Sequence, residues 1–222
     1  MKLRTAVLTS LAPAALAAPA TTSAATLSVD KPCYGAGERV QFSGTGYTPS
    51  GSVALSVSGQ QLGVGNASPI GDFTASLGAP AIDGKQRTDV FTATDQTNLA
   101  LTASVPVLLT SLNVTVKPKN GNPGKLKRIV ARGFTTGKVL YAHVLRGKTR
   151  RNVEIGRLKG PCKTLTTRRR LFSLDARTGV YRGQFDTRRR YSAQTSPQIG
   201  FLVTVFPVVK PAGASTAAGS WV

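Results

Sequence analysis

Short apolar runs rich in Val, Leu, Thr and Phe recur along the chain at intervals of roughly 8 to 14 residues, separated by Gly, Pro, Asn and Asp. Such spacing is typical of antiparallel all-β domains. No segment combines a helical period of apolar residues with capping residues at its ends, so we expect no substantial helix. The runs predict strands near residues 27–29, 40–43, 53–57, 73–77, 89–94 and 99–105, and again near 112–116, 126–131, 139–145, 152–158, 165–172, 180–185 and 200–205.

The predicted strands repeat as two copies of one unit. A Gly-aromatic pair at 46–47 recurs at 133–134, 87 residues later, and an aromatic strand that ends on an acid occurs at both 91–95 and 181–186. Glycine permits a positive backbone φ at a sharp corner, and Asp caps a turn through its carboxylate. A unit of about 90 residues fits an immunoglobulin-like (Ig-like) antiparallel β-sandwich. Chance recurrence in a Gly-rich chain is the alternative explanation.

The two ends of the chain differ from these units. Residues 1–25 combine the basic Lys2 and Arg4 with an apolar run and a final series of small residues, which predicts a cleaved secretory signal peptide. No later run reaches the roughly 20 apolar residues of a membrane helix. We therefore expect a secreted protein, extracellular or associated with the cell wall, with one sandwich over 26–111, a second over 112–209 and a disordered Pro/Ala/Gly/Ser tail over 210–222.

Charge separates the two predicted domains. Residues 26–112 carry four Lys or Arg against six Asp or Glu, whereas residues 113–222 carry 23 against three. A near-neutral module joined to a strongly basic one indicates that the second module binds a polyanion. Most of its cations are Arg, whose guanidinium group binds phosphate and carboxylate in a bidentate way that an ammonium group cannot reproduce.

The basic residues cluster at the ends of predicted strands. The residues that we assign to a polyanion-binding surface are Lys125, Lys127, Arg128, Arg168, Arg169, Arg170, Arg188, Arg189 and Arg190. We expect the two Arg triplets to lie close together at the ends of a hairpin over 171–187. An anionic polymer of the cell envelope is the favoured partner, nucleic acid is less favoured, and the oligomeric state is open.

Two alternatives to polyanion binding remain at this point. The first is a purely structural or adhesive module, because edge strands carry charges that block aggregation. The second is a carrier that holds a small molecule in a deep apolar pocket of an Ig-like cleft.

Residue types that carry catalysis are scarce in the basic half. His143 is the only histidine, and no nucleophile or second imidazole stands beside it in the sequence, so we expect a structural role. The acids Glu154, Asp175 and Asp186 stand among basic residues, which suits neither paired-carboxylate hydrolysis nor metal binding. No phosphate loop, His/Cys ligand spacing or Gly-x-Ser-x-Gly turn occurs. We expect neither an enzyme nor a bound metal or cofactor.

The chain contains two cysteines, Cys33 and Cys162, which fall in different predicted domains. An even number of cysteines in an oxidising compartment favours a disulfide. This pairing would hold the two domains in one relative orientation. Two free thiols are the alternative, because sequence alone does not place the two Cα atoms within bridging distance.

Several turn motifs resemble those of a known class of proteins. The first half is similar to secreted bacterial Ig-like domains in Cys33-Tyr34-x-x-Gly37-Glu38, in Gly44-Thr-Gly46-Tyr47-Thr-Pro49 and in the strand that ends at Asp95. Residues 126–209 resemble the basic partner domain of such tandem proteins in Arg132-Gly133-Phe134, Gly160-Pro161-Cys162 and Phe185-Asp186. The resemblance implies two tandem Ig-like sandwiches. It implies no particular activity, because these motifs specify turns.

Overall fold

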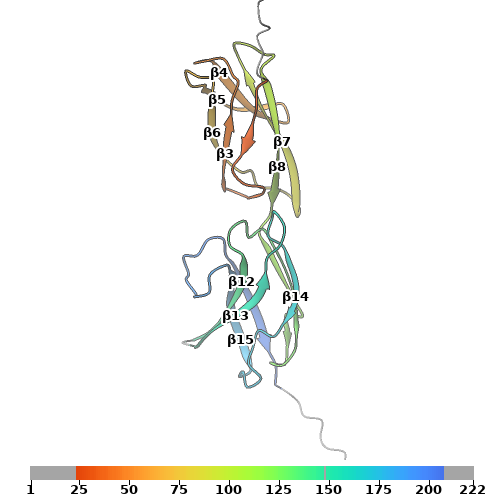
Figure 1. Cartoon of the computed structure of the whole chain (residues 1–222). Coiled ribbons are helices and arrows are strands. Elements are labelled where there is room, and N and C mark those ends of the chain that lie inside the picture. Colours follow the sequence, from red (N-terminus) through yellow and green to blue (C-terminus); the bar gives the residue numbers. More distant parts are fainter. Residues whose placement is uncertain (1–23, 148, 208–222) are drawn as a thin grey trace, which may run out of the picture.

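The computed structural model describes residues 24–147 and 149–207, and every regular element in this part is a β-strand (Figure 1). The strands form two sandwiches placed end to end, which confirms the all-β fold class. The predicted signal peptide lies outside the described residues except for Ala24 and Ala25, and the predicted tail at 210–222 lies entirely outside them.

The first sandwich comprises eight strands in two sheets. Its strands are β1 (Ser28–Val29), β2 (Tyr34–Gly35), β3 (Arg39–Gly44), β4 (Ser52–Val57), β5 (Gln60–Asn66), β6 (Phe73–Gly78), β7 (Gln86–Asp95) and β8 (Thr102–Thr110). One sheet has the order β1-β3-β6, and the other has the order β2-β8-β7-β4-β5. All pairings are antiparallel except β2 with β8.

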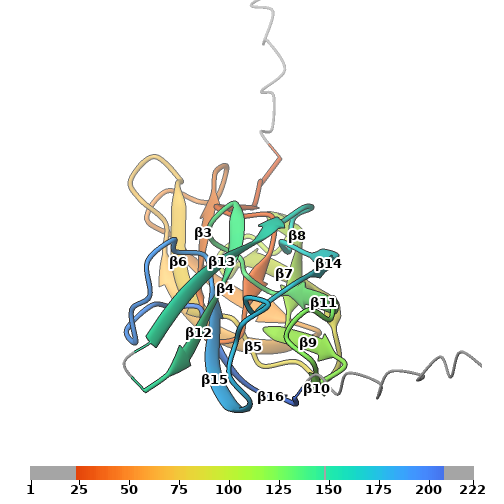
Figure 2. The ribbon, with the colours of Figure 1, turned by 90° about the horizontal axis from the view of Figure 1, so that it is seen from below.

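The second sandwich repeats the first strand for strand. Its strands are β9 (Asn113–Lys117), β10 (Asn120–Gly121), β11 (Lys127–Arg132), β12 (Val139–Arg146), β13 (Thr149–Arg157), β14 (Leu165–Arg169), β15 (Gly179–Asp186) and β16 (Ile199–Val205). The sheets are β14-β11-β9 and β10-β16-β15-β12-β13, so each strand of the first domain corresponds to the strand whose number is eight higher, as β1 does to β9. Figure 2, seen from below, shows β14, β11 and β9 together on one side of this domain.

The topology is Ig-like because the third and sixth strands of each unit share one sheet, while the fourth, seventh and eighth share the other. This is the division of strands B and E from strands C, F and G in an immunoglobulin domain, and the fifth strand adds to the latter sheet as C′ does. The Gly-aromatic corners also recur: Gly46 and Gly133 have φ of 82° and 80°. Tyr47 and Phe134, which follow them, are both buried.

Each sandwich has its own hydrophobic core. In the first, Phe42, Phe73 and Phe91 are among the buried residues between the two sheets. In the second, Ile129, Leu140 and Phe185 belong to a separate buried cluster. Buried residues alternate with exposed or half-buried ones along β3 and β11, as expected for strands with one face on a core.

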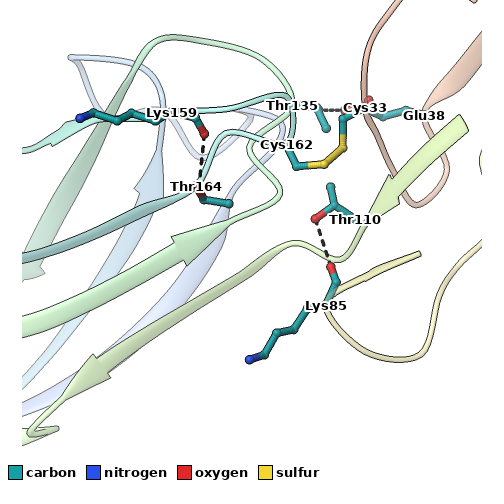
Figure 3. Close-up of a disulfide and its surroundings, with 8 residues drawn as sticks. All are labelled: Cys33, Glu38, Lys85, Thr110, Thr135, Lys159, Cys162 and Thr164. Carbon is teal, nitrogen blue, oxygen red and sulfur yellow. Dashed lines mark hydrogen bonds between the residues drawn. A yellow bond between two sulfur atoms is a disulfide. The ribbon is translucent and has the colours of Figure 1, made fainter. Parts of the chain in front are cut away.

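A short connection and a disulfide hold the two domains together. β8 ends at Thr110 and β9 begins at Asn113, so only two residues connect the sandwiches. Cys33 and Cys162 form a disulfide with a Cα–Cα distance of 5.3 Å, which confirms the predicted pairing (Figure 3). Beside it, the Thr135 hydroxyl of the second domain donates to the Glu38 carboxylate of the first.

Candidate functional site

The outer face of sheet β14-β11-β9 is the most basic surface that the strand register assembles. On β11, Ile129 and Ala131 point into the core, whereas Arg128, Val130 and Arg132 belong to the opposite phase. The neighbouring strands follow the same alternation, because Arg128 pairs with both Arg168 of β14 and Lys117 of β9. Side chains of residues paired across strands project from the same face of the sheet.

Three exposed cations therefore form one row across three strands, in the order Arg168, Arg128, Lys117. Neighbouring strands lie about 5 Å apart, so each cation stands beside a like charge. Like charges placed directly opposite one another destabilise a sheet. A row of this kind is tolerable only where solvent or a bound anion screens the repulsion.

The positive surface continues along β11 to the domain junction. Arg132 lies four residues beyond Arg128 on the same face, about 13 Å along the strand. Lys85 of the first domain lines the same two hollows as Arg132, with volumes of about 220 and 380 Å³, and Lys159 of the second domain lines the larger of the two. Figure 3 shows Lys85 extending from the first domain toward the second. We call this surface the basic strip, and it consists of Lys85, Lys117, Arg128, Arg132, Lys159 and Arg168.

No carboxylate neutralises the basic strip within the described part of the chain. The residues that line its two hollows include no Asp or Glu. Within residues 24–147 and 149–207 the ion pairs join Lys31 to Glu38 and Arg87 to Asp89, and Asp186 contacts the His143 ring, so none of these contacts uses a strip residue. In addition, the Nε of Arg132 is buried without a hydrogen-bond partner. The strip therefore has unused donor capacity as well as unpaired charge.

The structure corrects two features of the surface predicted from sequence. Lys127 is fully buried, and its Nζ donates to the Asn120 carbonyl at 2.8 Å. Burial, followed by the nearby charge of Lys125, lowers the pKa of this lysine. Lys127 occupies the inward phase of β11, so it cannot belong to the exposed face.

The predicted hairpin over 171–187 does not form. β14 pairs with β11, whereas β15 pairs with β12 and β16 in the other sheet. Arg168, Arg169 and Arg170 lie at the end of the second domain remote from the junction, because Arg169 pairs with Lys127 at the start of β11. The segment between β14 and β15 crosses from one sheet of the sandwich to the other, so the two strands do not form a hairpin.

The second triplet lies at the opposite end of the domain. Asp186, where β15 ends, pairs with Tyr141 near the start of β12, and Thr187 lies against Gly137 in the loop before that strand. Arg188, Arg189 and Arg190 are exposed in the following loop, on the junction side. The nine predicted residues therefore do not form one continuous surface. Of them, only Arg128 and Arg168 belong to the basic strip.

The remaining predicted cations have separate positions. Lys125 and Arg170 are exposed in loops at the remote end. Arg169 turns toward the other sheet, where its Nε donates to the Ile155 carbonyl at 3.1 Å. Sequence reasoning missed Lys85, Lys117, Arg132 and Lys159 because it weighted consecutive basic residues. The signal that could have found two of them is the alternation on 113–117 and 127–132, which puts single cations in the outward phase.

His143 has the structural role expected of it. The ring is fully buried, its Nδ1 lies 2.8 Å from Asn152 Oδ1, and its Nε2 lies 3.1 Å from Asp186 Oδ1. Tyr191 covers the ring at a centroid distance of 5.8 Å. Both nitrogens have polar partners within the fold, so neither is available to activate a nucleophile.

Asp186 also holds the loop that carries Arg188, Arg189 and Arg190. Asp186 Oδ1 accepts from the Arg188 amide at 2.7 Å, and its Oδ2 accepts from Gln184 Nε2 at 2.5 Å. In the first domain Asp95 Oδ1 accepts from the Thr97 amide at 2.7 Å, which is the equivalent turn. The repeated acid at the end of an aromatic strand therefore caps the same corner in both domains.

The carrier alternative requires a deep apolar pocket, but cationic side chains line two clefts of the second domain. One cleft of about 620 Å³ is lined by Arg146, Arg151 and Arg177 together with aromatic rings, and it opens to solvent. Another, of about 640 Å³, lies beside β16 and includes Lys119 and Arg182. Within the described residues, no group of three or more His, Cys, Asp or Glu side chains is arranged to hold a metal ion. The same residues include no helix that could cross a membrane.

Comparison with known proteins yields likenesses at the level of structure alone. No family model matches the chain, and no curated protein matches it. Among solved structures it is similar to the human OSCAR ligand-binding domain, with 11% identity and a TM-score of 0.37, over 83% of this chain and 99% of that chain. A likeness this distant carries no functional argument. The Ig-like assignment stands on the strand order of the two sandwiches.

Proposed function

We propose that this protein is a secreted, non-enzymatic binding module whose second domain docks on a polyanion of the cell envelope through the basic strip. The observation that carries the proposal is the row of Arg168, Arg128 and Lys117 across three paired strands, with no carboxylate among the residues that line the adjoining hollows. A phosphate-bearing or carboxylate-bearing chain laid along the strip relieves the repulsion within the row. It also engages the guanidinium groups in charge-assisted hydrogen bonds.

The length of the strip favours a polymer over a single small anion. Arg128 and Arg132 are separated by about 13 Å along β11, and Lys85 of the other domain continues the line. A ligand that touches all of them must itself be extended. The disulfide supports the extracellular part of the proposal, because such bonds persist in oxidising compartments.

Protection of edge strands explains only part of this charge. β14 and β9 are the two edges of their sheet, so Arg168 and Lys117 could serve to prevent aggregation. β11 is the central strand of the same sheet, however, and it carries Arg128 and Arg132. A central strand has no free edge to protect, so its two outward arginines favour a binding role.

The test compares two triple variants that remove the same charge. The first replaces Arg128, Arg132 and Arg168 with Gln, and the second replaces Arg188, Arg189 and Arg190 with Gln. Binding is measured against a poly(glycerol phosphate) wall polymer, phosphatidylglycerol vesicles and duplex DNA across a salt titration. We expect the strip variant to bind the wall polymer at least about tenfold more weakly, whereas the control stays near wild type.

Four outcomes would contradict the proposal. Equal losses in both variants would show that binding depends only on net charge. Unchanged binding of the strip variant would show that the basic strip does not contact the polymer. If duplex DNA were bound more tightly than the wall polymer, with a log–log salt slope near −5 as expected for about six phosphate contacts, the partner would be nucleic acid. Aggregation of the strip variant without loss of binding would instead favour edge protection.

A further inference from the structure

The end of the second domain remote from the first carries most of that domain's exposed large apolar side chains. Among residues 112–147 and 149–207, five such residues are exposed, and four of them belong to this end. These four are Leu126, Leu174, Val180 and Phe206, each between 47% and 70% exposed. We call them the apolar tip. Exposed apolar residues scattered singly are normal on a soluble protein, whereas a group of them marks an interaction site.

The two leucines of the apolar tip lie on adjoining loops. Leu126 directly precedes Lys127, the first residue of β11, which lies at this end of the domain. A Cβ on Gly124 would stand 3.1 Å from Leu174 Cδ2. The segment between β14 and β15, which carries Leu174, therefore packs against the loop that carries Leu126.

Val180 and Phe206 adjoin these loops from the other sheet. The Phe206 amide donates to the Gly121 carbonyl at 3.1 Å, which ties the end of β16 to the start of the loop that carries Leu126. Val180 is the second residue of β15 and pairs with Thr204 of β16, two residues before Phe206. The apolar tip thus comes from four segments of the chain that meet at one end of the molecule, the end from which Figure 2 is viewed.

Basic side chains stand beside the apolar tip. One directly precedes Leu126 in the chain, and three line an open cleft of about 620 Å³ whose wall includes both sequence neighbours of Leu174. A Cβ on Gly179, next to Val180, would stand 3.3 Å from Arg146 Nη2, so this guanidinium group also borders Val180. The four cations are Lys125, Arg146, Arg151 and Arg177.

One carboxylate offsets these cations. Residues 113–222 contain three acids, Glu154, Asp175 and Asp186. Glu154 and Asp186 both pair with Tyr141 near the start of β12, on the junction side. Asp175 lines the cleft, and a side-chain hydrogen bond from Ser173 lowers its pKa, so this acid is ionised at neutral pH. Four cations therefore face one anion around the apolar tip.

We propose that the apolar tip inserts among the headgroups of an anionic lipid bilayer while its four cations bind the lipid phosphates. Such a bilayer presents negative charge at its surface and apolar chains directly beneath it, and this order matches exposed apolar side chains flanked by cations. None of these residues belongs to the basic strip, so the contact is separate from the proposed function. The protein lies on the membrane through its loops and does not span it.

Charge and position favour a bilayer over other occupants of the apolar tip. A second copy of this chain would bring the same cations against one another, and like charges repel. The tip is the free end of two sandwiches placed end to end (Figure 1), so a broad surface can approach it without meeting the first domain.

The first domain supplies a matched control. Ile70 and Leu99 are 80% and 69% exposed, so they are as accessible to a bilayer as the apolar tip. Their loops, 67–72 and 96–101, contain no Lys or Arg. Replacing these two residues removes the same kind of surface where no cations stand beside it.

The test measures co-sedimentation of the full mature chain with vesicles of mixed phosphatidylglycerol and phosphatidylcholine. Leu126→Ser with Leu174→Ser should weaken partitioning at least about tenfold, because two apolar side chains no longer leave water on binding. Ile70→Ser with Leu99→Ser should leave partitioning near wild type. The tip variant should also keep its binding to the wall polymer, so loss of this site and failure of the proposed function are distinguishable.

A tryptophan probe measures insertion itself. In a Trp221→Phe background, Leu174→Trp should be quenched by lipids brominated on their acyl chains, whereas Ile70→Trp should not. At saturating lipid, adding the three Gln substitutions of the strip variant should leave the quenching of Leu174→Trp in place. Vesicles of phosphatidylcholine alone should bind more weakly, because they lack the negative charge that attracts the cations.

Several results would overturn the proposal. Equal partitioning of the two double variants, or binding without quenching of Leu174→Trp, would show that the tip does not insert. Phosphatidylcholine vesicles bound as tightly as phosphatidylglycerol vesicles would show that the cations do not contribute. Vesicle binding that appears only after removal of residues 208–222 would show that the chain itself covers the tip. A dimer that is lost in Leu126→Ser with Leu174→Ser would assign the tip to a second copy.

Discussion

Asp95 illustrates how one buried acid can hold a corner of the first domain. Its carboxylate accepts from the Thr48 amide at 2.6 Å, the Thr97 amide at 2.7 Å and the Asn98 amide at 3.0 Å. Burial by itself would raise its pKa, but these backbone donors outweigh burial and lower the pKa below the ordinary value. Asp186 of the second domain accepts from one backbone amide, that of Arg188, and also contacts the side chains of His143 and Gln184.

Replacing Asp95 with Ala should destabilise the first domain by about 3 kcal/mol, because buried amides lose a charged acceptor. Chemical denaturation followed by the amide signals of β4 and β7 measures the loss. The second domain provides the internal control, since its own core is separate. A loss below 0.5 kcal/mol, typical of surface substitutions, would contradict the structural role.

The lowered pKa of Asp95 also predicts how the first domain responds to acid. A group whose pKa is depressed by folding stabilises the fold fully above its unfolded pKa, which is about 3.9 for Asp. That contribution is lost as the pH falls through the lower, folded value. We therefore expect acid unfolding of the first domain to become steeper below about pH 4. Asp95→Asn should remove this part of the pH dependence, and an identical acid profile for that variant would contradict it.

At the scale of elements, the corner between β11 and β12 is fitted closely against the domain junction. Gly133 has a φ of 80°, and its amide donates to the Cys162 carbonyl at 3.1 Å. A Cβ at this position would stand 2.6 Å from the Ser111 carbonyl oxygen and 2.8 Å from the Leu112 Cα. The backbone of the two-residue connection therefore occupies the space that any other residue would need.

Gly133→Ala should therefore lower the free energy of unfolding by more than the backbone strain alone would. Gly59 has the same φ of 80° but no atom within 4 Å of a Cβ, so Gly59→Ala isolates the strain, which is about 1 kcal/mol. We expect Gly133→Ala to lose at least about 2 kcal/mol more, as overpacked positions do. Thermal unfolding of both variants measures the difference. Equal losses would show that the connection moves aside without cost.

At the scale of the whole molecule, the disulfide joins domains that each have a core of their own. The bridge spans 129 residues of sequence. In the chain-entropy model a loop of that length stabilises a single cooperative fold by about 5 kcal/mol. Two separate cores unfold as separate units, so the expected effect on either domain is smaller than this upper value. The main consequence of the bridge is a fixed relative orientation, which keeps Lys85 beside Arg132 in the basic strip.

The double variant Cys33→Ser with Cys162→Ser should keep both sandwiches folded and loosen their orientation. Residual dipolar couplings should fit one alignment tensor in the wild type and require two in the variant. We also expect wall-polymer binding to weaken several-fold, because one strip cation is supplied by the first domain. A single tensor for the variant would show that the short connection and the Thr135–Glu38 contact suffice to fix the orientation.

The sequence by itself determined the strand class and predicted the repeat, and it favoured the cysteine pairing that the structure then confirmed. Apolar alternation and turn residues are local signals, so twelve of the thirteen predicted strands overlap observed strands of five residues or more, and the one at 27–29 overlaps only the two-residue β1. β2, β5 and β10 were not predicted. β5 was missed because Gln60–Asn66 is polar, Gly-rich and mostly exposed, and it becomes a strand only by pairing with β4 at the edge of a sheet.

Only the tertiary structure decided which cations share a surface. Sequence adjacency suggested that Arg168–Arg170 and Arg188–Arg190 act together, but the chain crosses between sheets after β14, and this separates them. The same register brings Lys117, Arg128 and Arg168 into one row, although these residues come from three segments. Lys127 is hidden, because its phase on β11 points inward. Local patterns specify strands, whereas a surface depends on which strands pair and in what register.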